Sequence, residues 1–144
     1  MSNRYRNGSL VRAVRLLTLL LLLPLAGRGQ VAISQVYGGG GNTTAGTTYT
    51  RDYVELFNKT ASAVNIGGYT LQYGAATSTT PFAVSSAIAA GTMLQPGQYY
   101  LVVLGTAGTA GAAVPAPDFN PTATLNLNGT NGKVALEQFP IQCT

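Results

Sequence analysis

The segment DYVELFN, Asp52–Asn58, decides the class of fold because its side chains alternate with a period of two residues. Val54 and Leu56 fall on one face of an extended chain, and Tyr53 and Phe57 fall on the other. β-Branched and aromatic residues are typical of strands, and alternation of this kind indicates a strand with one face on a core. The sequence therefore predicts a strand over these seven residues.

Further strands are expected on both sides of this segment. Val31–Tyr37 precedes it, and the residues between the two, 38–50, form a flexible loop rich in glycine and threonine. A turn at residues 65–68 leads to residues 69–73, in which three apolar side chains alternate with two polar ones. That alternation predicts a strand with one buried face and one face in contact with solvent.

Pro96-Gly97 predicts a tight turn of type II. Proline fixes φ at the second position of such a turn, and glycine accepts the positive φ of the third position. The turn leads into residues 98–104, QYYLVVL, which are apolar on both faces. We therefore expect a central strand that is covered from both sides.

The C-terminal part of the sequence adds short elements. Residues 105–117 are a Gly/Ala/Pro stretch too poor in large side chains to pack, so a loop is expected. Leu125 and Leu127 alternate with polar residues, and Val134 and Leu136 mark a last strand. Residues 83–93 are interpreted as one short strand and a loop. Many short strands separated by turns predict one all-β domain, a sandwich or a barrel.

The first 29 residues have the organisation of a secretory signal peptide. Four arginines precede the apolar residues 16–26, and Gly27 and Gly29 follow them. A positive segment, about 7–15 apolar residues and small residues before the cleavage point define such a signal. A membrane anchor, the alternative, would need about 20 apolar residues. We therefore expect cleavage after Gly29, membrane contact only before cleavage, and a secreted or cell-surface domain over residues 30–144.

Removal of the signal peptide changes the sign of the net charge. The whole chain has eight Lys and Arg against four Asp and Glu, a net charge of +4. Five of the basic residues lie within residues 1–29, which leaves three basic against four acidic residues, a net charge of −1. Proteins that bind nucleic acid present clusters of basic residues to the phosphates. The domain is therefore not expected to bind nucleic acid.

The sequence lacks the residue combinations of the common catalytic sites. The chain has no histidine, which excludes Ser-His-Asp triads, Cys-His pairs and histidine-containing zinc sites. Asp52 and Glu55 are close in sequence, but residues three apart on a strand point to opposite faces and cannot act together on one substrate. The glycine run at residues 38–41 lacks the Lys-Ser/Thr pair and the helix of a phosphate-binding loop. We predict no enzymatic activity, no metal site and no cofactor.

Asp52 is a carboxylate close to the glycine-rich loop, so a calcium site is one interpretation of this region. With carbonyl oxygens of residues 38–42 it could contribute ligands, but Ca²⁺ takes about six to eight oxygens and the loop supplies no further carboxylate. The preferred interpretation is structural. In it, Asp52 pairs with Arg51 or caps the loop, and Glu55 is a surface charge.

A candidate contact surface surrounds the same loop. Tyr37, Tyr49 and Tyr53 flank it, whereas the tyrosines at residues 69–73 and 98–104 have the spacing of core residues. Aromatic side chains combine apolar area with a polar group, which suits contact surfaces, including surfaces that bind sugars. Tyr37, Tyr49, Asp52 and Tyr53 are therefore the candidate contact residues.

Several stretches together resemble the lamin-tail domain, in the version found on exported bacterial proteins. They are VAISQVYGGGG (residues 31–41), DYVELFN (52–58), GYTLQY (68–73), LQPGQYYLV (94–102) and, more weakly, GKVAL (132–136). The resemblance implies an immunoglobulin-like β-sandwich. It also implies an accessory role, because this module often precedes a separate nuclease or phosphatase domain.

The resemblance also implies that the domain is C-terminally incomplete. The family pattern continues beyond residue 136 with a further apolar strand, often with another cysteine, whereas this sequence ends at Thr144. Cys143 is its single cysteine, and one thiol cannot form an internal disulfide. We therefore expect a disulfide partner for Cys143 outside this chain.

The sequence as a whole predicts an exported, non-catalytic module that binds or targets, with a protein or a cell-surface component as its ligand. The alternative is a truncated N-terminal accessory domain of an exported hydrolase, a nuclease or a phosphatase, without its catalytic part. A third interpretation is self-association through an unpaired strand edge, where the backbone donors and acceptors of another chain can bind.

Overall fold

The computed structural model describes residues 29–138 and Cys143. In this part of the chain the structure consists of strands and loops, without a helix. The strands are β1 (Val31–Tyr37), β2 (Asp52–Asn58), β3 (Val64–Asn65), β4 (Thr70–Gly74), β5 (Ala83–Val84), β6 (Met93–Leu94), β7 (Tyr99–Leu104) and β8 (Lys133–Glu137). Residues 1–28, on which the predicted signal peptide falls, lie outside the described residues.

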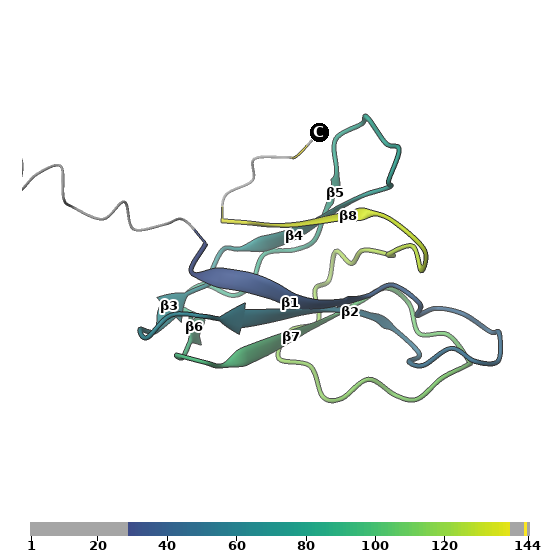
Figure 1. Cartoon of the computed structure of the whole chain (residues 1–144), viewed down its shortest axis with the longest axis horizontal. Coiled ribbons are helices and arrows are strands. Elements are labelled where there is room, and N and C mark those ends of the chain that lie inside the picture. The colour runs from purple at the N-terminus through teal and green to yellow at the C-terminus, as the bar shows by residue number, and fades with distance from the viewer. Residues whose placement is uncertain (1–28, 139–142, 144) are drawn as a thin grey trace, which may run out of the picture.

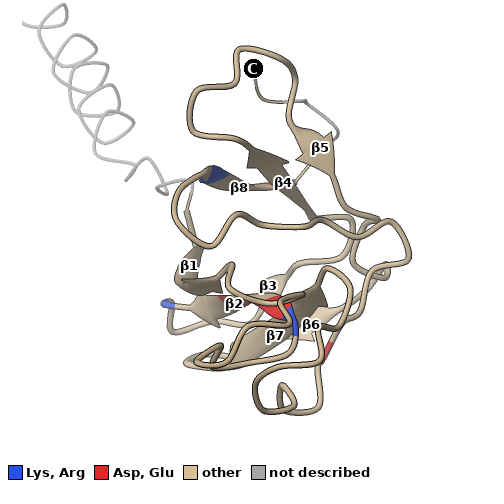
Figure 2. Ribbon diagram, turned by 90° about the vertical axis from the view of Figure 1, so that its right-hand side faces the viewer, with Lys and Arg blue, Asp and Glu red and all other residues tan. Residues whose placement is uncertain are grey.

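The strands form two three-stranded antiparallel sheets that pack against each other. One sheet has the order β1-β2-β7 and the other β5-β4-β8, while β3 and β6 form a short two-stranded ladder. Figure 1 shows β8 and β4 in a layer above β1, β2 and β7, and Figure 2 shows the same two layers from the side. This confirms the predicted all-β, immunoglobulin-like β-sandwich.

The core lies between the two sheets. Val54 and Leu56 of β2 are fully buried, whereas Phe57 on the opposite face is only partly buried, as the alternation in the sequence predicts. The other residues of the core cluster are Val64, Ile66, Leu71, Ile88, Leu94, Tyr100, Val102, Leu104, Leu125 and Leu127. Each fully buried aliphatic side chain contributes about 1.5–3 kcal/mol to folding, so this cluster is the main source of stability.

Leu125 and Leu127 reach the core without belonging to a strand. Their exposed fractions are 4% and 8%, but the segment around them has no ladder partner in the described structure. Its backbone is held by side chains instead, as in the bond from the Leu127 amide to the Asp52 carboxylate at 2.8 Å. The predicted alternation therefore marks core residues of an extended loop.

The prediction of a central strand at residues 98–104 is wrong, although Val102 and Val103, on opposite faces of the strand, are both buried as predicted. β2 is the central strand, and β7 lies at the edge of its sheet, with Tyr99 54% exposed. The loop that follows β7 returns along this edge. The Phe119 amide donates to the Leu101 carbonyl at 3.1 Å, and the Phe119 carbonyl accepts from the Val103 amide at 3.0 Å. This loop supplies hydrogen-bond partners for backbone groups at the edge of β7. The composition of the strand alone could not predict this contact.

The prediction of a solvent-exposed polar face on residues 69–73 is also wrong. Thr70 and Gln72, the two polar residues, are 8% and 0% exposed. The Cys143 amide donates to the Gln72 side-chain oxygen at 2.8 Å. The Phe82 ring lies against Gly74, where a Cβ atom would come within 2.6 Å of it. β4 is therefore covered on both faces.

The turn chemistry agrees with the sequence. Gly97 has φ +69°, and the Gln98 amide donates to the Gln95 carbonyl at 3.0 Å, which closes the predicted turn around Pro96-Gly97. The last predicted strand is β8, and residues 83–93 contain the short strand β5 followed by a loop that reaches β6.

Candidate functional site at the glycine-rich loop

The glycine-rich loop, residues 38–50, connects the end of β1 to the start of β2 at one end of the sandwich (Figure 1). Backbone hydrogen bonds join it to the loop that follows β7. The Thr50 carbonyl accepts from the Gly108 amide at 2.7 Å, and the Thr48 carbonyl accepts from the Ala112 amide at 2.9 Å. The two loops thus hold each other in place.

Asp52 fixes the base of this region. Its exposed fraction is 3%, and its two carboxylate oxygens accept from the Gly40 amide and from the Leu127 amide, each at 2.8 Å. One carboxylate therefore ties the glycine-rich loop to the extended segment that carries Leu125 and Leu127. Gly40 is needed for this approach, because a Cβ atom there would lie 2.2 Å from the Asp52 amide nitrogen.

Burial raises the pKa of the Asp52 carboxyl above its ordinary value. The hydrogen bonds from Leu127 and Gly40 and the charge of Arg51 act in the opposite direction but do not cancel the loss of solvation. With both oxygens engaged by backbone amides, Asp52 is a structural group. Within the described residues, no cluster of three or more His, Cys, Asp or Glu side chains could hold a metal ion.

Arg51 does not pair directly with the Asp52 carboxylate. Its guanidinium donates to the Gly105 carbonyl at 3.1 Å and 2.7 Å, and to the Asn120 side-chain oxygen at 3.1 Å. Of the two structural roles considered for Asp52, the structure shows the loop cap. Glu55 accepts from the Ser34 hydroxyl at 2.7 Å across the β1–β2 ladder.

The three flanking tyrosines form one aromatic cluster. Tyr37 stacks on Tyr53 with ring centroids 5.4 Å apart, and Tyr49 meets the two rings edge-on at 5.5 Å and 5.6 Å. Tyr53 is buried at 7% exposed, and Tyr37 and Tyr49 are partly buried. The Tyr37 hydroxyl accepts from the amides of Thr48 and Tyr49, both at 3.1 Å. Asp52 and Tyr53 thus support the loop from beneath, and Tyr37 and Tyr49 reach its surface.

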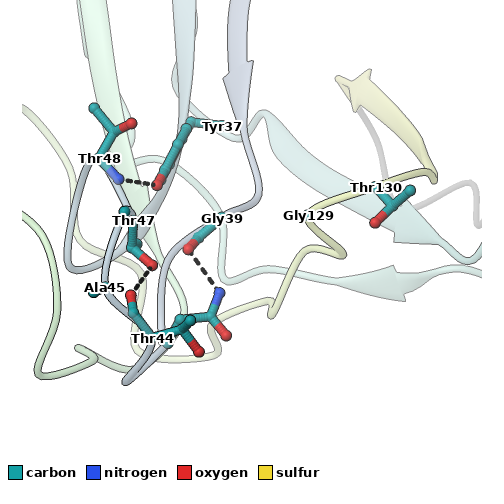
Figure 3. Close-up of a pocket in the computed structure, with 10 residues that line it drawn as sticks. Tyr37, Gly39, Thr44, Ala45, Thr47, Thr48, Gly129 and Thr130 are labelled. Carbon is teal, nitrogen blue, oxygen red and sulfur yellow. Dashed lines mark hydrogen bonds between the residues drawn. The ribbon is translucent and has the colours of Figure 1, made fainter.

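An open hollow of about 510 Å³ lies beside this cluster. Figure 3 shows several of the residues that line it, with Thr48 bonded to Tyr37 and Thr47 bonded to Thr44. The lining consists of Tyr37, Gly39, Asn42, Thr44, Ala45, Gly46, Thr47, Thr48, Gly129 and Thr130. This set, called the threonine hollow below, has uncharged polar groups and backbone at its surface.

Some polar groups of the threonine hollow hold the loop, and others are available to a ligand. The Asn42 side-chain Nδ2 donates to the Gly39 carbonyl at 2.9 Å, and the Thr47 hydroxyl donates to the Thr44 carbonyl at 2.9 Å. By contrast, the hydroxyls of Thr44, Thr48 and Thr130 have no hydrogen-bond partner among the described residues. The hollow therefore presents neutral donors and acceptors on a loop that is already ordered.

Sequence reasoning did not place Gly129 and Thr130 at this site. They reach it because the Asn128 side chain caps a turn, accepting from the Thr130 amide at 2.8 Å and the Asn131 amide at 3.2 Å. The Tyr73 hydroxyl accepts from the Asn128 amide at 3.1 Å and positions the turn. The Asn-Gly pair predicts a turn at this point, but its position beside residues 44–48 depends on how the sheets pack.

Cys143 lies away from the threonine hollow, above β4. Its carbonyl accepts from the Phe82 amide at 2.8 Å, and its sulfur lies 3.7 Å from a carboxylate oxygen of Glu137. Loss of solvation and the Glu137 carboxylate raise the pKa of the thiol, which disfavours the reactive thiolate. The thiol is free in the described structure, and its disulfide to another chain stays a prediction.

The two packed sheets define an immunoglobulin-like β-sandwich module. The family model of the lamin tail domain matches residues 24–138, so the chain belongs to the lamin tail domain family. That family consists of non-catalytic immunoglobulin-like domains. No curated protein matches the chain. The described residues contain no helix that is long and apolar enough to cross a membrane.

Proposed function

We propose that the chain is an exported, non-catalytic binding module whose contact surface is the threonine hollow. Its ligand is a neutral, hydroxyl-rich component of a cell surface, and a saccharide chain is the chemical class that the lining fits. The observation that carries this proposal is the set of hydroxyls at Thr44, Thr48 and Thr130 on a loop that is fixed by other bonds.

The order of the loop supports a binding role. Immobilising flexible groups costs free energy on association, so a surface that is ordered in advance binds more tightly than a flexible one. Here the Asp52 carboxylate, the Tyr37 hydroxyl and the ladder to the neighbouring loop hold the hollow in shape. The lining has no Lys, Arg, Asp or Glu, which suits a ligand without charge.

The test is binding to an array of neutral oligosaccharides. The double variant Thr44→Ala/Thr48→Ala removes two unbonded hydroxyls and keeps the backbone bonds of both residues, so we expect it to lose at least about 1 kcal/mol of binding free energy. Thr77→Ala/Thr79→Ala, in the loop between β4 and β5 at the top of Figure 1, is the matched control and should bind as the unchanged protein does.

Two outcomes would contradict the proposal. One is an unchanged protein that binds no neutral oligosaccharide on the array. The other is equal loss in the hollow variant and the control variant, which would show that the hydroxyls of the hollow are not the contact. Ionic strength gives an independent check, because a neutral ligand should bind with little dependence on salt.

A further inference from the structure

The edges of the two three-stranded sheets are protected to different degrees. Unpaired strand edges attract other chains, and proteins block them with bulges, short strands or covering loops. β7 is covered by the loop at Phe119, and β5 has only two residues, next to the bond between Phe82 and Cys143. β1 carries a bulge between Ile33 and Gln35. Each of these three edges has a recognisable protecting feature.

β8 is the fourth edge, and within the described residues it has neither a bulge nor a covering loop. Its five residues pair with β4 in unbroken register, without a bulge, and it has no strand partner on its other side within the described structure. Figure 2 shows β8 at the side of its layer. A regular strand of this length offers a template for another strand.

The direction of the free backbone groups on β8 follows from the pairing of β4. The carbonyls of Tyr69 and Leu71 accept from residues on the β5 side, so the peptide groups of Thr70, Gln72 and Gly74 face β8. Their register partners on β8 are Glu137, Ala135 and Lys133. Because peptide groups alternate along a strand, those of the two intervening residues, Val134 and Leu136, point toward the open edge.

The sequence of β8, KVALE, is complementary to itself when two copies run antiparallel. If Ala135 lies opposite Ala135 of a second copy, Val134 lies opposite Leu136, and Lys133 lies opposite Glu137. We infer that this edge joins two copies of the chain through a symmetric antiparallel β8–β8 pairing centred on Ala135.

In this register every outward-pointing N–H and C=O group of β8 has a hydrogen-bond partner. Val134 and Leu136 of the two copies form hydrogen-bonded pairs, which use the N–H and C=O groups that point outward from each strand. Each copy also places its Lys133 opposite a Glu137, and opposite charges across strands are favourable. In the single chain Lys133 donates to the Ser78 carbonyl at 3.2 Å, and Glu137 accepts from the Cys143 thiol at 3.7 Å. Both side chains exchange these partners for each other in the dimer. A register shifted by two residues would lose at least one of these charge pairs.

Apolar side chains on this side of the sandwich are incompletely covered. Val134 and Leu136 contact the core but stay partly exposed, and so does Ile33 of β1. Val36, whose register partner Val54 is fully buried, is itself 46% exposed. The twofold axis of the dimer is perpendicular to the β5-β4-β8 sheet, so the core-facing sides of this sheet in the two copies point in the same direction. The second copy therefore continues the β5-β4-β8 layer, which lies over β1.

The dimer should be weak, because one five-residue strand pair buries less than the roughly 1,000 Å² of a stable interface. The test is sedimentation velocity over a range of concentrations, on protein made from the full gene with its N-terminus defined by sequencing. We expect Lys133→Glu and Glu137→Lys each to weaken dimerisation at least about tenfold, because like charges then oppose each other at two places. The double exchange Lys133→Glu/Glu137→Lys should restore it.

Lys59→Glu, at an exposed position just after β2, is the matched control for a charge reversal and should leave dimerisation unchanged. Thermal melts of all variants show whether each remains folded. A protein that stays monomeric up to about 1 mM, the range of very weak association, overturns the proposal. The proposal is also wrong if neither Lys133→Glu nor Glu137→Lys weakens dimerisation, or if the double exchange does not restore it.

A cross-link tests the register itself. Opposed residues in a non-hydrogen-bonded pair have Cα atoms about 4.5 Å apart, within the about 4.4–6.8 Å that a disulfide spans. Ala135→Cys in a Cys143→Ser background should therefore form a covalent dimer on mild oxidation. Thr79→Cys in the same background should not. If a different protein occupies the edge in place of a second copy, no Ala135→Cys dimer forms in the purified chain, and the proposal is wrong.

Discussion

At the scale of single residues, Asp52 shows how a charged side chain can organise a loop without reacting with anything. Its position at the start of β2 is visible in the sequence, but its two partners, Gly40 and Leu127, are distant in the chain. Gly40 permits the contact because any side chain there would collide with the backbone of Arg51 and Asp52. The stability of the ordered loop therefore depends on a carboxylate that is almost completely buried.

The raised pKa of Asp52 predicts a specific dependence of stability on pH. The folded chain keeps the proton at pH values at which the unfolded chain, with a pKa of about 3.9, has released it. The free energy of unfolding therefore falls as pH rises from the unfolded-state pKa through the raised folded-state pKa. Asp52→Asn cannot titrate, so this part of the fall should be missing in the variant.

Denaturant unfolding between pH 3 and pH 7 measures this effect, with Glu55→Gln as a control that removes a carboxyl outside the Asp52 contacts. The advantage of the unchanged protein over Asp52→Asn should be largest at low pH and should shrink as pH rises. An advantage that grows with pH would show that the amides of Gly40 and Leu127 outweigh burial and lower the pKa.

At the scale of elements, the local sequence pattern predicts where strands occur better than it predicts which segments lie next to each strand. The strands predicted at Val31–Tyr37 and Asp52–Asn58 are β1 and β2 with their observed bounds, and Pro96-Gly97 gives the turn before β7. The position of β7 at an edge and the burial of Gln72 depend on chain segments that return from elsewhere. Composition does not record such tertiary contacts, so both were predicted incorrectly.

The covered outer face of β4 predicts a large effect of removing Phe82. This side chain is 6% exposed and lies against Gly74. Phe82→Ala should lower the free energy of unfolding by about 3–5 kcal/mol, the cost of a buried aromatic ring and the cavity that it leaves. Phe57→Ala, on the partly exposed outer face of β2, is the control and should cost clearly less. Denaturant unfolding of both variants measures the difference, and equal costs would mean that Phe82 contributes little to the cover of β4.

At the scale of the whole molecule, the fold and the candidate site differ in how far sequence predicts them. The family pattern and the strand periodicity establish the sandwich, and the glycine-rich loop is recognisable from composition. The threonine hollow is not, because Gly129 and Thr130 join residues 39–48 only after the two sheets have packed. The β8 edge also becomes visible only when the order of strands in both sheets is known.

The predicted cleavage after Gly29 falls just before the first described strand. The Gln30 carbonyl accepts from the Lys59 amide at 3.3 Å, and β1 starts at Val31. Cleavage after Gly29 therefore removes the apolar segment and leaves both the bond at Gln30 and the whole of β1 intact. N-terminal sequencing of exported material should begin at Gln30.

Small residues before the cleavage point are the feature that signal peptidase requires, so Gly27→Leu/Gly29→Leu should block processing. Gly8→Leu, among the basic residues that precede the apolar run, is the matched control and should be processed normally.

The mature chain should also migrate as a near-neutral protein with a net charge of −1, whereas the unprocessed chain carries +4. Isoelectric focusing separates the two forms. Recovery of the unchanged protein from membranes with residues 1–29 still attached would show that the segment is an anchor and would remove the basis for a freely exported module.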